Sequence, residues 1–440
     1  MSQTHKAVAA IILFALILRL AVLPVIYPLP PQAQMEAVVV SDATEFRDFA
    51  DHLVRYGPTR IYDICSQDFA ADADPSYVTT FRPPLYPILI AISFSLFGRS
   101  IVPVALAQIA LDIIALFAIF HLGRRLGGTD RAGLAPMLLH AINPLAIIMP
   151  ALMLAELVFH ALFIAALVAF YLALKKPALS RFAAAGATLG LCALTKIHVV
   201  YLLPSFLLGA LWGLRGLGTR RALTLAACML LLFGAVTGVW QYRNQRCYGY
   251  YSLSWLPDRD ILFQNAAYLM GRHKGEDWRS LWPDLHRRYP TDPYNPFLSA
   301  QKAKKAGWRY ILGHKAEYVA FHLGGASYDL FLEHHIFADG NYEGFAERAF
   351  IHYGLGARYM ILIGLIWKAV MLSLYAAIII PLLRRRPKSP FIQSLILVWA
   401  LLMAMSFVIY AFGPRYIYLH ASFTALLASA IHLGNNKAQT

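Results

Sequence analysis

Apolar residues run in long blocks along most of this chain, and short polar segments separate the blocks. A block of about 20 apolar residues, wound into an α-helix, is long enough to cross the hydrocarbon layer of a membrane. The pattern predicts about ten transmembrane helices, of which the fifth and sixth are short and could form a broken hairpin. The expected spans lie near residues 8–28, 101–122, 132–151, 155–174, 182–196, 199–214, 222–241, 358–383, 390–411 and 416–434.

Composition agrees with an all-α polytopic membrane protein. Of the 440 residues, 59% are hydrophobic and 14% are charged, whereas soluble domains carry about a quarter charged residues. The first apolar block has the position of a secretory signal peptide, but Arg19 interrupts its apolar core. We therefore expect this block to be retained as the first span, and we expect Arg19 within it to make hydrogen bonds between helices rather than to act in catalysis.

The formal net charge is +15, which by itself would fit nucleic-acid binding. The basic residues, however, are concentrated in short loops between the predicted spans. Such loops are typically cytoplasmic, so the pattern places both termini in the cytoplasm and argues against a nucleic-acid surface. The loops contain Arg124, Arg125, Arg131, Lys175, Lys176, Arg181, Arg215, Arg220, Arg221, Arg384, Arg385, Arg386 and Lys388.

Two long hydrophilic segments, residues 29–100 and 242–357, then fall on the outer side of the membrane. The chain is thereby divided into a first transmembrane module (1–241), which includes the first outer loop, the second outer segment (242–357) and the C-terminal transmembrane helices (358–440). The first outer segment is rich in acids between residues 30 and 82, and the second is rich in aromatic residues, proline and histidine. Segments of this size outside the membrane indicate a function beyond that of a simple channel.

The first outer segment ends with "RPPLYPILIAISFSLFG", in which apolar residues follow Arg82. The apolar part has about 14 residues and is too short to span, so we expect it to lie at or dip into the outer interface. Each outer segment also contains one cysteine, Cys65 in the first and Cys247 in the second. Because both fall on the oxidising side of the membrane, a disulfide between them is possible.

Apolar residues recur with the spacing of one helical face in "SDATEFRDFADHLV", residues 41–54. They are Phe46, Phe49, Ala50 and Leu53. The segment therefore predicts an amphipathic helix that lies along the membrane surface. Its first acids, Asp42 and Glu45, have the spacing of helix-capping residues, and the same two carboxylates are candidates for chemistry.

Several motifs follow one another along the chain: this acidic helix, "RPPLYP", "GRRLGG", "NPL…AELVF", "GLCALTK", "WQYRNQRCYGYY" and "GPRYIYLHASF". In this order the chain resembles the GT-C membrane glycosyltransferases, specifically the branch of protein mannosyltransferases and aminoarabinose transferases. The resemblance runs through most of the chain and is weakest in residues 250–357. It implies a GT-C fold in a bacterial inner (cytoplasmic) membrane, with a site on the periplasmic face under the two outer loops.

The resemblance also implies the reaction. A sugar would move, with inversion, from a polyprenyl-phosphate donor to a hydroxyl of a glycan, lipid or protein acceptor. Asp42, the first acid after the first span, would be the general base that accepts the hydroxyl proton, and fixed cations would hold the departing phosphate. No cofactor is certain from the family, and a divalent cation is possible.

Family position further implies the residues that bind the substrate. Glu45 would be a helper or only a cap. Glu156 would line the cavity as a second acidic site residue or a metal ligand, or it would pair with a base such as Lys196. The arginine side chains suit bidentate contact with phosphate, and the alternative for each is an anchor at the interface. The substrate-binding candidates are Glu45, Arg82, Glu156, Lys196, Arg243, Asn244, Arg415 and Tyr416.

The histidines of the second outer segment raise a metal hypothesis that no ligand motif supports. They include His273, His286, His314, His322, His334 and His335. We predict no metal site there.

Two other functions are considered beside the glycosyltransferase. A transporter or lipid flippase would have internal repeats and broken spans near the middle of the membrane, but no convincing repeat relates the two halves of the sequence. A non-catalytic membrane scaffold would tolerate substitution of Asp42 and Arg243.

Overall fold

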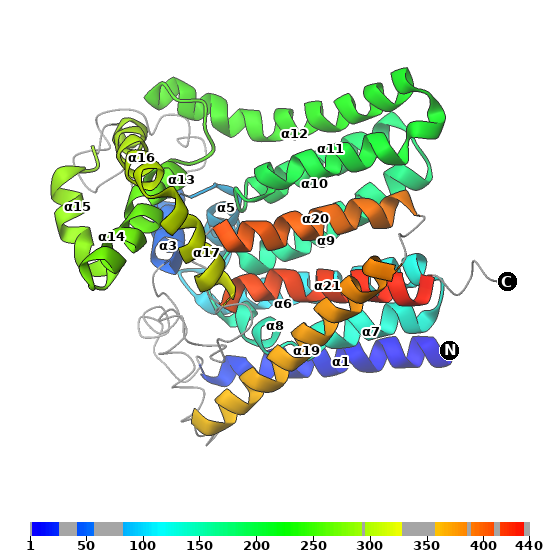
Figure 1. Cartoon of the computed structure of the whole chain (residues 1–440). Coiled ribbons are helices and arrows are strands. Elements are labelled where there is room, and N and C mark those ends of the chain that lie inside the picture. The colour runs from blue at the N-terminus through cyan, green and yellow to red at the C-terminus, as the bar shows by residue number, and fades with distance from the viewer. Residues whose placement is uncertain are drawn as a thin grey trace.

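The computed structural model describes residues 2–25, 42–56, 82–292, 295–327, 357–384, 389–408 and 414–434. Within these ranges every regular element is a helix, and a helix or helix pair coincides with each predicted span. The helices at the positions of the predicted spans form one elongated bundle (Figure 1). They are α1 (Gln3–Val22), α6 (Ile101–Gly127), α7 (Asp130–Ala141), α8 (Pro144–Ile148), α9 (Glu156–Lys175), α10 (Leu179–Ala193), α11 (Val199–Gly213), α12 (Thr219–Tyr248), α19 (Ala357–Arg384), α20 (Pro390–Val408) and α21 (Pro414–Gly434).

Length and hydropathy identify the helices that can span a membrane. Among the described residues, α1, α6, α9, α12 and the Leu365–Leu383 part of α19 are each long and apolar enough, and α7 with α8 forms a sixth span if the bent pair counts as one. The expected fifth and sixth spans, α10 and α11, are shorter apolar helices, as are the Phe391–Leu402 part of α20 and the Ala421–His432 part of α21. The count of ten therefore stays a prediction.

The expected span over residues 132–151 is broken. α7 ends at Ala141, and the helical stretch from Pro144 to Ala151 leaves it at an angle of 62°. Pro144 has no N–H with which to continue the hydrogen bonds of α7, and the Asn143 side chain caps the new helix by accepting from the Leu145 N–H at 3.0 Å. Non-helical backbone at this depth is tolerated where protein buries it.

Close packing of helices depends on small residues. α10 packs along α12 with Gly186 directly against the backbone of Met229, so a Cβ added to Gly186 would lie 2.1 Å from the Met229 carbonyl oxygen. α6 and α7 meet in the same way at Gly133, where a Cβ would lie 2.4 Å from the Phe120 carbonyl oxygen. Larger side chains at these two positions would separate the helices.

The described helices of the two outer segments lie at one end of the bundle, and the start of α1 and the end of α21 lie at the other (Figure 1). α12 continues beyond its predicted end at residue 241 to Tyr248, where Gly249 has a positive φ of 76°. The described helices of the outer segments are α3 (Asp42–Tyr56), α5 (Leu85–Phe97), α13 (Leu256–Asp260), α14 (Ala267–Lys274), α15 (Trp282–Arg288), α16 (Pro296–Gly313) and α17 (Lys315–Ser327). A π-helical turn over Ile261–Ala266 joins α13 to α14.

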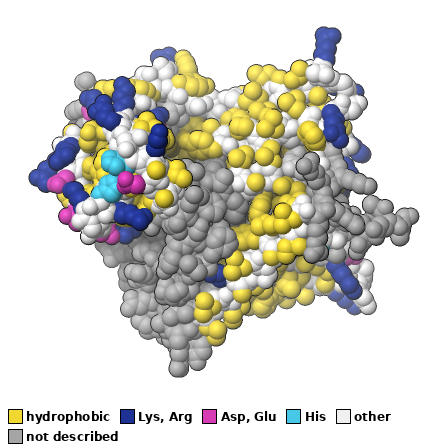
Figure 2. Space-filling model, in the orientation of Figure 1, with side chains coloured by type: hydrophobic (Ala, Val, Ile, Leu, Met, Phe, Trp, Pro, Cys, Tyr) yellow, Lys and Arg dark blue, Asp and Glu magenta, His cyan; other side chains and the backbone are white. Residues whose placement is uncertain are grey.

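The surface follows the same division. Figure 2 shows hydrophobic side chains along the bundle and charged side chains gathered near its two ends. On α12, Leu223 and Leu231 are 53% and 69% exposed, which places large apolar side chains where lipid would contact them. The second outer segment has a small hydrophobic core of its own, centred on Leu262, Phe263 and Ile311.

Candidate functional site

The predicted amphipathic helix is confirmed as α3. Its four expected apolar residues are all buried, at 4% exposure or less. They dock α3 onto two other helices: the Phe46 ring meets Tyr86 of α5 edge-on at 5.0 Å, and the Phe49 ring lies 6.2 Å from Trp240 of α12. This packing fixes where the first turn of α3 points.

That first turn holds two carboxylates against one arginine. Arg82 donates through Nη2 to Asp42 Oδ1 at 2.7 Å and through Nε to Glu45 Oε2 at 2.6 Å. The side chains are 17%, 19% and 29% exposed for Arg82, Asp42 and Glu45, so solvent reaches the cluster only in part. The structure thus joins three residues that the sequence singled out separately, and Asp42 faces a cation.

The electrostatics of this cluster are those of two acids competing for one base. Burial raises the pKa of Glu45, the Arg82 guanidinium opposes that rise, and the neighbouring Asp42 carboxylate adds to it. Ser41 lies outside the described residues, so the alternative role of Asp42 and Glu45 in capping α3 stays open.

Asp260, at the end of α13, is a site residue that the sequence analysis missed. Burial raises the pKa of its carboxyl to about 7; Arg259 and Arg82 oppose this rise, while Asp42 and Glu45 contribute to it. Asp260 therefore lies within electrostatic reach of the Arg82 cluster although it comes from the other outer segment. The signal in the sequence was an acid directly before the apolar run "ILF". In the structure, a π-helical turn follows Asp260, and such turns are frequent at functional sites.

Glu156 and Lys196 form an ion pair of 2.8 Å between Lys196 Nζ and Glu156 Oε1. The Glu156 side chain is 1% exposed and that of Lys196 is 12% exposed. The pairing expected as the alternative for Glu156 is therefore present.

A chain of hydrogen bonds connects this region to the start of α5. The Tyr86 hydroxyl donates to Gln108 Oε1 at 3.1 Å, and Gln108 Nε2 donates to the carbonyls of Pro150 and Leu152, both at 2.9 Å. These contacts hold the irregular stretch that leads into Glu156 at the start of α9. The burial of every partner makes the arrangement rigid.

Arg243 and Asn244 lie at the outer part of α12 and are both buried, at 1% and 0% exposure. Arg243 Nη1 donates to Asn244 Oδ1 at 2.9 Å, and its guanidinium lies over the rings of Trp240 and Tyr248. Asn244 Nδ2 in turn donates to the Ser252 carbonyl at 2.8 Å. Arg243 is a cation held inside the protein, which differs from an anchor exposed at the interface.

Some expectations lie outside the described residues. The backbone of Arg415 and Tyr416 is in α21, but their side chains are not described. Cys247 is disulfide-bonded, whereas Cys65 lies outside the described residues, so their pairing stays a prediction. The neighbouring histidines His334 and His335 are also outside.

The described histidines of the second outer segment make ordinary polar contacts. His273 Nδ1 pairs with the Tyr310 hydroxyl at 2.8 Å, and its Nε2 pairs with Glu317 Oε2. Protein groups thus occupy both ring nitrogens of His273. Among the described residues, the cluster of three possible metal ligands lies instead inside the bundle.

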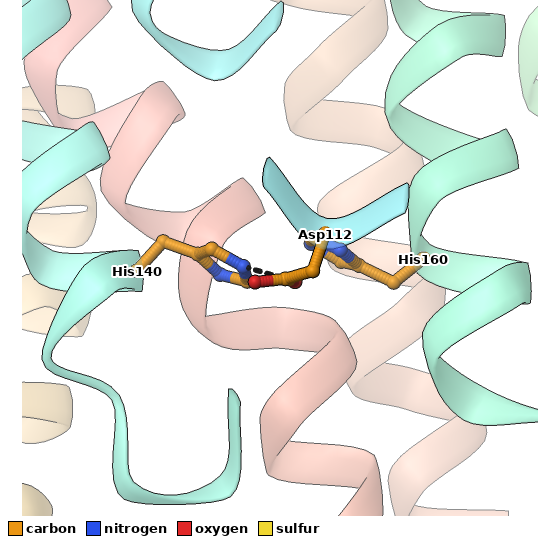
Figure 3. Close-up of side chains that lie close together, drawn as sticks. All are labelled: Asp112, His140 and His160. Carbon is orange, nitrogen blue, oxygen red and sulfur yellow. Dashed lines mark hydrogen bonds and ion pairs between the residues drawn. The ribbon is translucent and has the colours of Figure 1, made fainter. Parts of the chain in front are cut away.

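That cluster consists of Asp112, His140 and His160, and it is fully buried (Figure 3). Arg19 Nε donates to Asp112 Oδ2 at 2.5 Å, and His140 Nε2 contacts Asp112 Oδ1 at 2.9 Å. Arg19 also donates to the carbonyls of Ala141 and His140, at the end of α7. The expectation that Arg19 makes hydrogen bonds between helices is confirmed.

The geometry of this cluster does not suit a metal ion. The rings of His140 and His160 are stacked 4.7 Å apart and within 10° of parallel. An imidazole lone pair lies in the ring plane, so two parallel rings cannot direct their lone pairs at one point. In addition, Arg19 already compensates the Asp112 carboxylate, and a divalent ion would add uncompensated charge in a low-dielectric interior. We interpret the cluster as structural.

Together, the described helices define an integral membrane protein of the polytopic α-helical class, with its candidate site where the outer segments meet the bundle. Residues 81–240 match the family model of the dolichyl-phosphate-mannose-protein mannosyltransferases. The match confirms the resemblance to the GT-C membrane glycosyltransferases over this part of the chain. It includes Arg82, Glu156 and Lys196, and Asp42 lies before it.

Two solved structures of ArnT from Cupriavidus metallidurans are also similar to this chain. One is bound to undecaprenyl phosphate and has 15% identity, with 99% of this chain and 79% of that chain covered and a TM-score of 0.42. The other is in the apo state and has 15% identity, with 90% and 74% covered and a TM-score of 0.37. No curated protein matches the chain at a significant level.

Proposed function

We propose that this protein is a membrane glycosyltransferase that uses a polyprenyl-phosphate-linked sugar. The observation that carries the proposal is the family match over residues 81–240, combined with the ion pair that joins Arg82 of the matched region to Asp42. A family model alone would indicate a class of enzyme. The ion pair adds a carboxylate and a cation side by side at one partly enclosed point.

In the proposed reaction, the acceptor hydroxyl oxygen forms a bond to the anomeric carbon while the bond from that carbon to the phosphate oxygen breaks. Asp42 takes the hydroxyl proton, and the polyprenyl phosphate leaves with the bonding electron pair. Attack opposite the leaving group inverts the anomeric centre. A glycan, a lipid or a protein hydroxyl satisfies this chemistry equally well.

Arg82 is proposed to serve both the base and the leaving group. A guanidinium has five N–H donors in a fixed plane, so one arginine can hold a carboxylate and a phosphate oxygen together. When the donor phosphate arrives, we propose that it replaces Glu45 on Arg82, and that Asp42 keeps its contact. Lys196 and the buried Arg243 are the further cations proposed to stabilise the phosphate charge.

The broken α7–α8 span favours a transporter instead, because discontinuous helices form many transport sites. Side chains from other helices fix both sides of the break. Arg19 donates to the carbonyl of Ala141, the last residue of α7, and Gln108 donates to the carbonyls of Pro150 and Leu152. A break that is fixed by these hydrogen bonds fits a rigid enzyme scaffold better than a transporter, whose helices must move between two conformations.

The test uses the purified full-length protein with a panel of polyprenyl-phosphate sugars, and with membrane extract as the source of acceptor. We expect Asp42→Asn to lower the release of polyprenyl phosphate by about 10²- to 10⁴-fold. Asp48→Asn is the matched control, because Asp48 lies on the same helix and pairs with Arg47. Full activity of Asp42→Asn would disprove the assignment of Asp42 as the base. If the wild-type protein neither bound nor consumed any donor of the panel, the proposed activity itself would be disproved.

A further inference from the structure

The C-terminal ends of α3 and α5 form a second polar site, apart from the Arg82 cluster. A cavity of about 320 Å³ is lined there by Asp51, His52, Val54, Arg55 and Arg99. Arg99 lies two residues beyond the end of α5 and forms an ion pair with Asp51, and both residues line the cavity. The site therefore joins two helices that are far apart in the sequence.

The cavity is separate from the proposed active site. Asp42 and Arg55 stand at opposite ends of α3, and 13 residues of α-helix correspond to about 20 Å along its axis. One phosphate group cannot contact Arg82 and Arg55 at the same time over that distance.

Among the described residues that line the cavity, the formal charges sum to a positive value. Arg55 and Arg99 contribute two positive charges, and Asp51 contributes one negative charge. Burial lowers the pKa of His52, a backbone hydrogen bond at Asp48 opposes this, and the nearby Arg55 adds to the lowering, which favours the neutral ring. A lining with this charge is complementary to a singly charged phosphodiester.

An exposed apolar stripe leads along α5 to this cavity. Leu89, Ile92, Leu96 and Phe97 lie on the exposed side of α5, at 38%, 51%, 70% and 66% exposure. Their opposite neighbours Ile90 and Phe94 are buried at 0% and 3%. α5 is apolar on both sides and carries no charged residue, so in an integral membrane protein its exposed apolar side is suited to contact with acyl chains.

We propose that this cavity binds the phosphate of an anionic membrane glycerophospholipid, with the acyl chains of that lipid along the apolar stripe of α5. The lipid connects the end of α5 to the end of α3, and α3 carries Asp42 at its other end. The site is thus a binding site for a structural lipid beside the catalytic helix. The inference does not depend on the proposed glycosyltransferase activity.

Native mass spectrometry of the full-length protein, reconstituted in phosphatidylcholine with a fraction of phosphatidylglycerol, tests the proposal. We expect the wild-type protein to retain phosphatidylglycerol, and Arg99→Gln and Arg55→Gln each to bind it about tenfold more weakly. The matched control is Arg124→Gln, which removes another exposed arginine that pairs with an aspartate, Asp130.

Two further measurements distinguish the outcomes. Leu96→Ser removes part of the apolar stripe without changing charge, and we expect it to weaken lipid retention while the thermal stability in detergent stays unchanged. Inorganic phosphate should not displace the lipid. Equal retention by the arginine variants and the wild type, or displacement by inorganic phosphate with no effect of Leu96→Ser, would overturn the proposal.

Discussion

Arg82 contacts two carboxylates that lie one helical turn apart on α3, and this double contact determines the charge of the candidate site. Asp42 and Glu45 pair with Arg82, and Asp260 lies within electrostatic reach of Arg82 and Arg259, so three acids act on two arginines. The site therefore holds slightly more negative than positive charge before a substrate binds. A bound phosphate requires one of the acids to leave Arg82 or to carry a proton.

Asp260 is the acid best suited to carry that proton, because its pKa is raised to about 7, and burial is the largest cause. Its ordinary value is 3.8, so between about pH 4 and pH 7 the folded protein holds a proton that the unfolded chain has lost. The folded state is therefore most stable, as far as Asp260 is concerned, below about pH 4. Its free energy of unfolding falls as the pH rises from about 4 to about 7, because folding then requires Asp260 to take up a proton.

Asp260→Asn should remove this dependence, because asparagine resembles the protonated acid. We expect the variant to be more stable than the wild type at pH 8, by at most about 4 kcal/mol for a shift of about three pKa units. Thermal unfolding in detergent between pH 5 and pH 8 measures the difference. Asp284→Asn, at an exposed acid of the same segment, is the control, and parallel pH curves for Asp260→Asn and wild type would contradict the prediction.

At the scale of helices, two kinds of contact hold the bundle: close backbone packing at glycine and buried polar ties. The polar tie between α1, α6 and α7 is the Arg19–Asp112–His140 network. His160 extends it to α21 through a contact of 2.5 Å between its Nε2 and Ser422 Oγ. Charges at this depth are costly unless each is compensated.

Asp112→Leu should therefore be strongly destabilising, by about 3–5 kcal/mol, because it leaves the Arg19 charge buried without its carboxylate. The double variant Arg19→Met/Asp112→Leu removes both charges and should recover much of that loss. Unfolding of the purified protein in detergent gives both values. If Arg19→Met made the Asp112→Leu variant still less stable, by as much as Arg19→Met destabilises the wild type, the two residues would not be coupled.

Gly186→Ala should weaken the packing of α10 on α12, because its Cβ would meet the Met229 carbonyl oxygen at 2.1 Å. We expect a loss of about 1–3 kcal/mol, as for other overpacked sites. Gly234→Ala on α12 is the matched control, since a Cβ there meets nothing within 4 Å. Alanine favours helix over glycine, so the control should be neutral or slightly stabilising, and the same loss in both variants would refute the packing argument.

For the whole molecule, the arrangement of the described helices assigns those of the outer segments to one end and the loops α6–α7, α9–α10 and α11–α12 to the other (Figure 1). The bias of arginine and lysine predicts which end faces the cytoplasm, and the proposed function needs the Arg82 cluster on the outer face.

Labelling of intact cells with a membrane-impermeant thiol reagent tests this orientation. A cysteine introduced by Arg99→Cys, beside the outer cavity, should be labelled in intact cells. One introduced by Arg221→Cys, at the start of α12, should be labelled only after the membrane is opened. The reverse pattern would place the candidate site in the cytoplasm and would contradict the proposed outer-face reaction.

The sequence by itself determined the elements that local physics controls. Apolar blocks predicted the positions of the long helices because the thickness of the membrane sets their length, and the helical period of α3 predicted its buried face. It also predicted an interhelical role for Arg19, because an isolated charge in a span needs partners. The same reasoning applied to Asp112, the acid within the second expected span, would have identified its partner.

Only the tertiary structure decided which of these groups meet. Arg82 joins Asp42 and Glu45 across about 40 residues of chain, and Asp260 reaches the same cluster from the second outer segment. These contacts depend on how α3, α5 and α13 dock, and docking is determined by side-chain packing between segments distant in sequence. The pattern of apolar and polar residues within a segment does not specify which distant segment it packs against. The sequence therefore predicted the residues of the candidate site one by one, and the folded protein brings them together.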